Sequence, residues 1–210
     1  MEIKLTQNEG EFLVRLARKS VEEYLENHRL VMVPEDAPAT LMQRFGVFVT
    51  ISIKRHRRKE LRGCIGYPYP TTKLVKAVIE CAVNSSTQDP RFPPLSLDEL
   101  SQIIFEVSVL TPPQQIKVEN PIDLPSKIKV GKDGLIVESG INRGLLLPQV
   151  PIEYNWDERE FLSQACMKAG LTPDSWLVET TKIHKFQCIV VSEKSPNGSV
   201  EMKGPDLRAS

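Results

Sequence analysis

The stretch Gly46–Pro68, GVFVTISIKRHRRKELRGCIGYP, decides the fold of this chain. Apolar and polar residues alternate over Gly46–Lys54, which is typical of a half-buried β-strand. The basic run Lys54–Lys59 follows and predicts the turn of a hairpin, and the chain then returns over Leu61–Ile65. The stretch therefore predicts two paired antiparallel strands, with a glycine-flanked cysteine on the second.

Helices are predicted on both sides of this hairpin. A capping-box pattern opens a helix over residues 6–27, and a second helix is predicted over 71–86. The second helix must end before Asp89–Pro94, because three prolines cannot extend a helix. Asp157 caps a third helix, and Gly170 ends it.

The remaining strands are predicted from alternation and turn residues. Gln102–Thr111 and Lys182–Val191 each have the pattern of a strand. Lys127–Val130 and Leu135–Glu138 flank Lys132-Asp133-Gly134, which is a hairpin signal. Because hairpins are interleaved with helices, we expect an α+β fold with a mainly antiparallel sheet flanked by helices.

The element order also suggests a division of the chain. We expect a main α+β domain formed by residues 1–111 and 152–195, and a smaller β-rich lobe at 112–151. The polar segment 196–210, which contains glycine and proline, is predicted to be a loosely attached tail.

Composition excludes several classes of protein. Lysine plus arginine (27) equals aspartate plus glutamate (27), so net charge gives no general case for binding nucleic acid or membranes. No apolar run approaches the roughly 20 residues that span a bilayer, and the first residues lack a signal peptide. We therefore expect a cytoplasmic protein that does not bind membranes.

The scattered cysteines and histidines argue against a metal site. Four cysteines and three histidines form no C-x-x-C pair and no zinc-ligand spacing. Reduced thiols are expected. No dinucleotide or phosphate-loop fingerprint is present, so we expect no metal and no cofactor.

Cys64 lies between Gly63 and Gly66 and is the strongest candidate for chemistry. Missing side chains on both sides would let a ligand approach the thiol or the neighbouring peptide groups. Arg62, two residues away, would lower the thiol pKa and favour a nucleophilic thiolate. The alternative is a small buried residue in a close-packed strand, because free cysteines are among the most buried residue types.

Three further side chains are candidates. Glu106 shares a strand face with apolar residues, so it is expected either to pair with Arg62 or Arg91 or to act as a general base. Arg91 and Phe92 lie on a proline-stiffened loop, which fits either a recognition element or a simple helix stop. His184, on a predicted strand, is expected to be a core or edge histidine rather than a catalytic partner.

Six motifs occur in the order that one known family shows. The chain is identified by them as a member of the AMMECR-one domain family, over roughly residues 8 to 192, in a stand-alone prokaryotic and archaeal version. These motifs are Leu61–Gly66, Asp89–Pro94, Glu106–Pro113, Lys127–Gly131, Gly134–Glu138 and Gly144–Pro151.

The resemblance implies a two-part α+β fold with a cleft, but no established reaction. It also implies a link to Memo-like and radical-SAM proteins, with which prokaryotic relatives are associated. Our first hypothesis is an enzyme-like domain that binds a small or peptide substrate in a cleft around Leu61–Gly66, with thiol chemistry. The alternative is a non-catalytic protein-binding or adaptor module. A weaker alternative is nucleic-acid association through Lys54–Lys59.

The candidate residues of the first hypothesis fall into two groups. The catalytic candidates are Cys64 and Glu106. The substrate-binding candidates are Arg62, Gly63, Gly66, Arg91 and Phe92.

Overall fold

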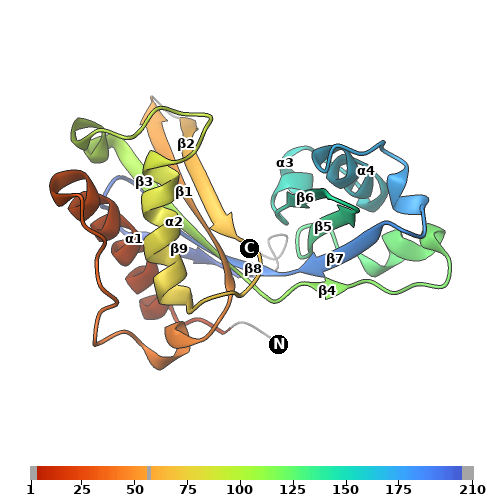
Figure 1. The fold of residues 1–210 in the computed structure, drawn as a ribbon, viewed down its shortest axis with the longest axis horizontal. Helices are drawn as coiled ribbons and strands as arrows, with labels where there is room; N and C mark the ends of the chain where they lie inside the picture. Colours follow the sequence, from red (N-terminus) through yellow and green to blue (C-terminus); the bar gives the residue numbers. More distant parts are fainter. Residues whose placement is uncertain (1–3, 56–57, 205–210) are drawn as a thin grey trace. The chain divides into compact units, whose positions relative to one another are not determined.

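The computed structural model describes residues 4–55 and 58–204 and shows an α+β fold with two sheets (Figure 1). The sequence prediction of the fold class is confirmed. The elements follow in the order α1 (Gln7–Asn27), η1 (Ala39–Met42), β1 (Gly46–Arg55), β2 (Arg58–Tyr67), α2 (Leu74–Thr87), η2 (Leu97–Gln102), β3 (Ile103–Leu110), β4 (Gln114–Gln115), η3 (Pro121–Lys127), β5 (Gly134–Ser139), β6 (Asn142–Leu146), α3 (Val150–Glu153), α4 (Glu158–Lys168), η4 (Ser175–Leu177), β7 (Lys182–Phe186), β8 (Cys188–Glu193) and β9 (Val200–Lys203).

The chain divides into two units. The first unit lies within residues 1–110 and 189–202 and contains a five-stranded sheet in the order β2-β1-β3-β8-β9. The second unit is built mainly from residues 111–188 and contains a four-stranded sheet in the order β4-β7-β5-β6. Across the described residues, every helix is too short or too polar to span a bilayer.

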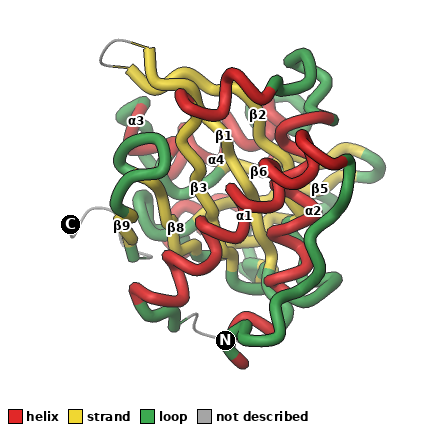
Figure 2. The backbone as a smooth tube through the Cα atoms, turned by 90° about the vertical axis from the view of Figure 1, so that its left-hand side faces the viewer, coloured by secondary structure: helices red, strands yellow, loops and turns green. Residues whose placement is uncertain are grey.

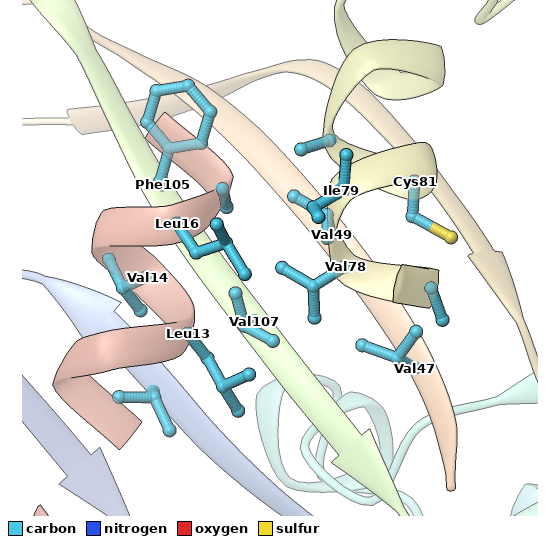
Figure 3. Packing of buried hydrophobic residues seen from close by; sticks show 14 of the residues in the cluster. Leu13, Val14, Leu16, Val47, Val49, Val78, Ile79, Cys81, Phe105 and Val107 are labelled. Atoms are coloured by element: carbon cyan, nitrogen blue, oxygen red, sulfur yellow. The ribbon is translucent and has the colours of Figure 1, made fainter. Parts of the chain in front are cut away.

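The core of the first unit lies between its sheet and two helices. Helices α1 and α2 cover one face of the sheet (Figure 2). The alternating apolar residues of β1 and β3 point into this core and meet the apolar stripes of both helices (Figure 3). The labelled residues of the cluster are Leu13, Val14, Leu16, Val47, Val49, Val78, Ile79, Cys81, Phe105 and Val107.

Local signals in the sequence match the elements of the first unit. Helix α1 begins with the expected capping box, in which Thr6 accepts a hydrogen bond from the Glu9 amide at 3.2 Å and the Glu9 carboxylate accepts one from the Thr6 amide at 2.8 Å. Strands β1 and β2 form the expected antiparallel hairpin. Residues 56–57 of the basic run, where a turn is predicted from the sequence, lie outside the described residues.

The second unit differs from the sequence expectation in its strands. Residues 127–130 form no strand. The hairpin instead joins β5 and β6, with its turn at Gly140-Ile141. The predicted strand over 182–191 is broken at Gln187, so β7 joins the four-stranded sheet and β8 joins the five-stranded one. Alternation alone does not show that one extended run serves two sheets.

The division between the units also differs from the expected one. Helix α4 and strand β7 lie in the second unit rather than the main domain, because β5 pairs with both β6 and β7 and the apolar face of α4 packs on β5. The expected tail contains β9, which extends the five-stranded sheet at its edge. Residues 205–210 lie outside the described part of the chain.

Candidate functional site

The two glycines around Cys64 allow close packing rather than access to the thiol. A Cβ atom at Gly63 would collide with the backbone carbonyl oxygen of Ser85, near the end of α2. A Cβ at Gly66 would collide with the ring of Phe48 on β1. The idea that these missing side chains open a path to Cys64 is therefore corrected: the space is already filled by α2 and by Phe48.

Cys64 lies in a row of polar side chains that crosses three strands. Thr50 on β1 pairs with Cys64 on β2 and with Glu106 on β3. Because successive residues of a strand point to opposite faces, these three lie on the face opposite the apolar core, away from α1 and α2. The Thr50 hydroxyl donates a hydrogen bond to the Cys64 sulfur at 3.3 Å. We call this face, with Thr50, Cys64 and Glu106, the polar face.

The environment of Cys64 favours the protonated thiol. Burial raises the pKa of the Cys64 thiol. The hydrogen bond from Thr50 and the positive charge of Arg91 oppose this rise in pKa, whereas the negative charges of Asp89 and Glu106 add to it. The thiolate that nucleophilic catalysis requires is therefore disfavoured at neutral pH.

The sequence predicts that Arg62 lowers the pKa of the Cys64 thiol, but in the structure Arg62 binds other groups. A register shift opposite Ile51 and Ser52 marks a bulge in β2 at this position. The Arg62 guanidinium forks onto Glu99, with N–O distances of 2.9 and 3.1 Å. It also donates to the carbonyl oxygens of Pro93 and Pro94. Arg62 thus holds the proline-rich loop and η2 against the edge strand β2.

The buried carboxylate of Asp89 organises the site. It accepts a hydrogen bond from the Cys64 amide at 2.8 Å and one from the Arg91 amide at 3.1 Å. It also receives Nε and Nη2 of Arg91, at 2.9 and 2.7 Å. These bonds, led by the one from the Arg91 side chain, lower the pKa of Asp89 to about 2. Asp89 therefore stays ionised and fixes both the cysteine strand and the arginine.

Arg91 is held firmly yet remains half exposed. Its side chain is 53% exposed, whereas that of Asp89 is 2% exposed. Nη2 of Arg91 also lies 3.4 Å from the carbonyl oxygen of Cys64, and the guanidinium carbon lies 5.6 Å from the centre of the Phe92 ring. Among the described residues, no hydrogen-bond partner meets Nη1 of Arg91. The loop therefore presents a fixed cationic group beside Cys64.

Several residues that the structure places around Cys64 were not predicted from the sequence. Asp89, Thr50, Ser85 and Glu99 were not candidates. Ser85 accepts a hydrogen bond from the Ile65 amide at 2.9 Å and so holds β2 at its outer edge. A signal for Thr50 was present, because the hairpin register places it opposite Cys64. Asp89 carried a weaker signal: a carboxylate two residues before an arginine on a loop stiffened by prolines.

Glu106 lies on the polar face, but the two arginines that were expected to pair with it have other partners. Arg62 pairs with Glu99, and Arg91 pairs with Asp89. Glu106 is close enough to Cys64 to raise the pKa of the thiol, so it joins the site as a source of negative charge. The hydrogen bond at the Cys64 sulfur comes from the Thr50 hydroxyl, which is not a base.

His184 and the described cavities belong to the second unit. His184 lies on β7 between Gln115 of β4 and Ile136 of β5, and its Nδ1 atom is buried without a partner among the described residues. A cavity of about 400 Å³ is lined by Trp176, Ile116 and Leu124, among others, and a second one of about 350 Å³ lies at Trp156. Neither cavity is lined by Cys64.

No cluster of side chains in the described ranges 4–55 and 58–204 has the make-up of a metal centre, since no three histidine, cysteine or acidic residues gather there. The four cysteines are free thiols, of which only Cys64 is partly exposed. The charged and polar groups of the candidate site are therefore the Arg91 guanidinium held by Asp89 and the side chains of Thr50, Cys64 and Glu106.

Comparisons with known proteins give a consistent answer. A family model described as AMMECR1 matches residues 14–191. A protein of Pyrococcus abyssi is 53% identical over 203 residues, covering 95% of this chain and 98% of the relative. A protein of Methanocaldococcus jannaschii is 48% identical over 196 residues, covering 93% and 96%.

A solved structure is also similar. The crystal structure of an uncharacterized protein from Pyrococcus horikoshii matches with a TM-score of 0.91 and 50% identity, covering 96% of this chain and 100% of that one. Together with the family model, this match confirms the resemblance drawn from the six sequence motifs, and the matched relatives are archaeal as expected.

Proposed function

The chain belongs to the AMMECR1 family, and on that premise we propose that it is a ligand-binding module rather than a thiol enzyme. The ligand is a small molecule or a peptide with an anionic group, carboxylate or phosphate, and it binds beside the Leu61–Gly66 motif. The observation that carries the proposal is the Arg91 guanidinium, which a buried carboxylate fixes in a half-exposed position.

Pre-organisation is the physical basis of the proposal. A flexible surface arginine loses side-chain entropy when it binds, whereas an arginine already clamped by Asp89 loses much less. Arg91 uses Nε and Nη2 for the clamp, which leaves Nη1 to donate to a ligand oxygen. The Phe92 ring lies beside the guanidinium and offers an apolar surface to the rest of the ligand.

The neighbouring strand supports the same assignment. The Thr50 hydroxyl and the Cys64 thiol are uncharged polar groups on the polar face, so they can exchange hydrogen bonds with a ligand. The Glu106 carboxylate on the same face opposes an anion, so the anionic group is expected to lie at Arg91 and not at Glu106. Cys64 in this arrangement is a contact residue and not a nucleophile. The thiol chemistry of our first hypothesis is less well supported, because the pKa of Cys64 is raised.

Nucleic-acid association through Lys54–Lys59 gains no support from the structure. Residues 56–57 lie outside the described residues, and the Lys59 ammonium donates to the Ser192 hydroxyl at 3.3 Å. Since one lysine of the run is engaged within the first unit, we do not propose this function.

Arg91→Gln is expected to weaken anion binding strongly. The probes are N-acetylglycine and inorganic phosphate, with uncharged N-acetylglycinamide as the matched neutral ligand. In ¹H–¹⁵N NMR spectra we expect the anions, but not the amide, to shift the Cys64 and Arg91 backbone signals in a saturable way. The variant should weaken binding at least about tenfold, as expected for the loss of a charge-assisted contact.

Arg143→Gln is the matched control for this experiment. Arg143 is 58% exposed and pairs with Glu138 in the second unit, so it resembles Arg91 in charge and exposure. Its replacement should leave the anion titration unchanged. Equal weakening by both variants would show that only general charge matters, and no saturable shift in the native protein would overturn the proposal.

The Cys64 thiol is expected to react slowly with iodoacetamide at neutral pH. Because its pKa is raised, the alkylation rate should reach its midpoint above the value of about 8.5 that is ordinary for a free thiol. Arg62→Ala should not move this midpoint, since Arg62 is held by Glu99. Peptide mapping by mass spectrometry separates Cys64 from the buried cysteines. An alkylation midpoint well below a pH of about 8, which Arg62→Ala shifts back to the ordinary value, would favour the enzyme hypothesis instead.

A further inference from the structure

A cavity in the second unit combines an aromatic ring with acidic side chains. It has a volume of about 350 Å³ and lies where the loop after α3 enters α4. Its lining residues include Trp156, Asp157 and Glu158, with Pro151, Ile152 and Asn155 completing it. The proposed function does not use this cavity, which is built entirely from residues 151–158.

The indole of Trp156 is held in place by its neighbours. The ring of Tyr154 stacks on it with centroids 5.0 Å apart and planes inclined by 17°. Between them Asn155 adopts a left-handed conformation, with φ of 54°. The Trp156 amide donates to the Pro151 carbonyl at 2.9 Å, which fixes the loop. The aromatic wall is therefore formed before any ligand binds.

The charged groups of the cavity are acidic. One oxygen of Asp157 accepts the amide of Glu160 at 2.8 Å and caps α4. Glu158 is partly buried, and in the part of the chain that the structure describes its carboxylate has no hydrogen bond or ion pair. Arg159, the next residue, does not line the cavity. Glu158 lies in the first turn of α4, where the helix dipole already stabilises its carboxylate. The negative charges of Glu158 and Asp157 beside an indole match a cationic occupant rather than an anionic one.

We propose that this cavity binds an arginine side chain of a partner polypeptide. A planar guanidinium can lie against the indole and fork onto the Glu158 carboxylate at the same time, whereas a lysine ammonium can make the contact with only one point charge. The proline and isoleucine in the wall accommodate the methylene stem of the arginine. The occupant is thus defined by charge, planarity and length.

The test uses capped amino acids as probes of the intact chain. N-acetylarginine amide is compared with N-acetylcitrulline amide, which has nearly the same shape but no charge, and with N-acetyllysine amide. The readout is the indole Nε1–H signal of Trp156 in NMR spectra. The chain has two tryptophans, so Trp176→Phe assigns the two signals. We expect the arginine probe to give a saturable shift, citrulline to give none, and lysine to bind at least about fivefold more weakly.

Two matched variants separate binding from folding. Glu158→Gln is expected to weaken the arginine probe at least about fivefold, through loss of the charge-assisted contact. Glu160→Gln removes an equally acidic side chain from the same helical turn, but one that bonds Gln164 at 2.7 Å and does not line the cavity. It should change binding by less than about twofold.

Three results would overturn the assignment. The first is binding of citrulline as tight as that of arginine, and the second is an unchanged affinity in Glu158→Gln. The third is the absence of any saturable shift up to about 20 mM probe, which corresponds to an affinity too weak for a specific contact. None of these results bears on the anion site of the first unit, so the two proposals stand or fall separately.

Discussion

Gly63→Val is expected to prevent stable folding of the first unit. The new side chain would be driven into the carbonyl oxygen of Ser85, and a backbone atom near the end of α2 cannot move aside without separating the helix from β2. Overpacking alone costs about 1–3 kcal/mol, and the displaced helix adds the loss of apolar contacts. The cost is therefore comparable to the whole stability of a domain of this size, about 5–15 kcal/mol.

Thermal unfolding followed by circular dichroism tests this expectation. Gly63→Ala should already destabilise the protein, because the collision begins at the Cβ atom. Gly204→Val is the matched control, since a Cβ at Gly204 meets nothing within 4 Å. If Gly63→Val unfolded at the temperature of the native protein, the close approach of α2 to β2 would be disproved.

The sequence predicted well those elements whose signals are local. The capping box of α1 and the alternation of β1 depend on residues a few positions apart, and the structure confirms both. The cap of α4 on Asp157 and its end near Gly170 belong to the same class. Such signals act before tertiary structure forms, so a pattern in the sequence is enough to identify them.

Features that depend on distant pairing could not be predicted in the same way. The run over 182–191 has one continuous strand pattern, yet its two halves pair with strands of different sheets. The turn at Lys132-Asp133-Gly134 resembles a hairpin, but Asp133 instead accepts the Lys129 amide at 2.9 Å and closes a local turn. Which strand pairs with which is set by the whole core, and no single window of sequence contains that information.

The candidate site shows the same limit. The glycine-flanked motif marks a part of the molecule where side chains beyond glycine do not fit, but its glycines accommodate α2 and Phe48 instead of admitting a ligand. Arg62 appeared to be the natural neighbour of Cys64 from its spacing, whereas the charge that reaches the thiol comes from Arg91, 27 residues away. Only the folded chain brings Asp89, Arg91 and Cys64 together.

Asp89→Asn is expected to produce the second large effect, because it removes a buried charge with several partners. The buried carboxylate accepts charged hydrogen bonds from the Cys64 amide and the Arg91 side chain, and because Arg91 is half exposed their loss costs about 1.5–3 kcal/mol. The variant should also lose anion binding, since Arg91 is no longer clamped. Asp36→Asn is the matched control: Asp36 is exposed and has no hydrogen bond or ion pair to any described residue.

The stability difference between native protein and Asp89→Asn should depend on pH in a defined direction. The folded state lowers the pKa of Asp89 from its ordinary value near 4 to about 2, so ionised Asp89 stabilises the fold at every pH above that ordinary value. As the pH falls from about 4 to about 2 the unfolded chain takes up a proton at Asp89 before the folded protein does, and about 2 kcal/mol of this stabilisation is lost. Urea unfolding at pH 7, 4 and 2.5 measures it: the two unfolding curves should approach each other only in the acidic range. A difference that stays constant down to pH 2.5 would show that Asp89 is not held ionised by its partners, and the rigid presentation of Arg91 would lose its physical basis.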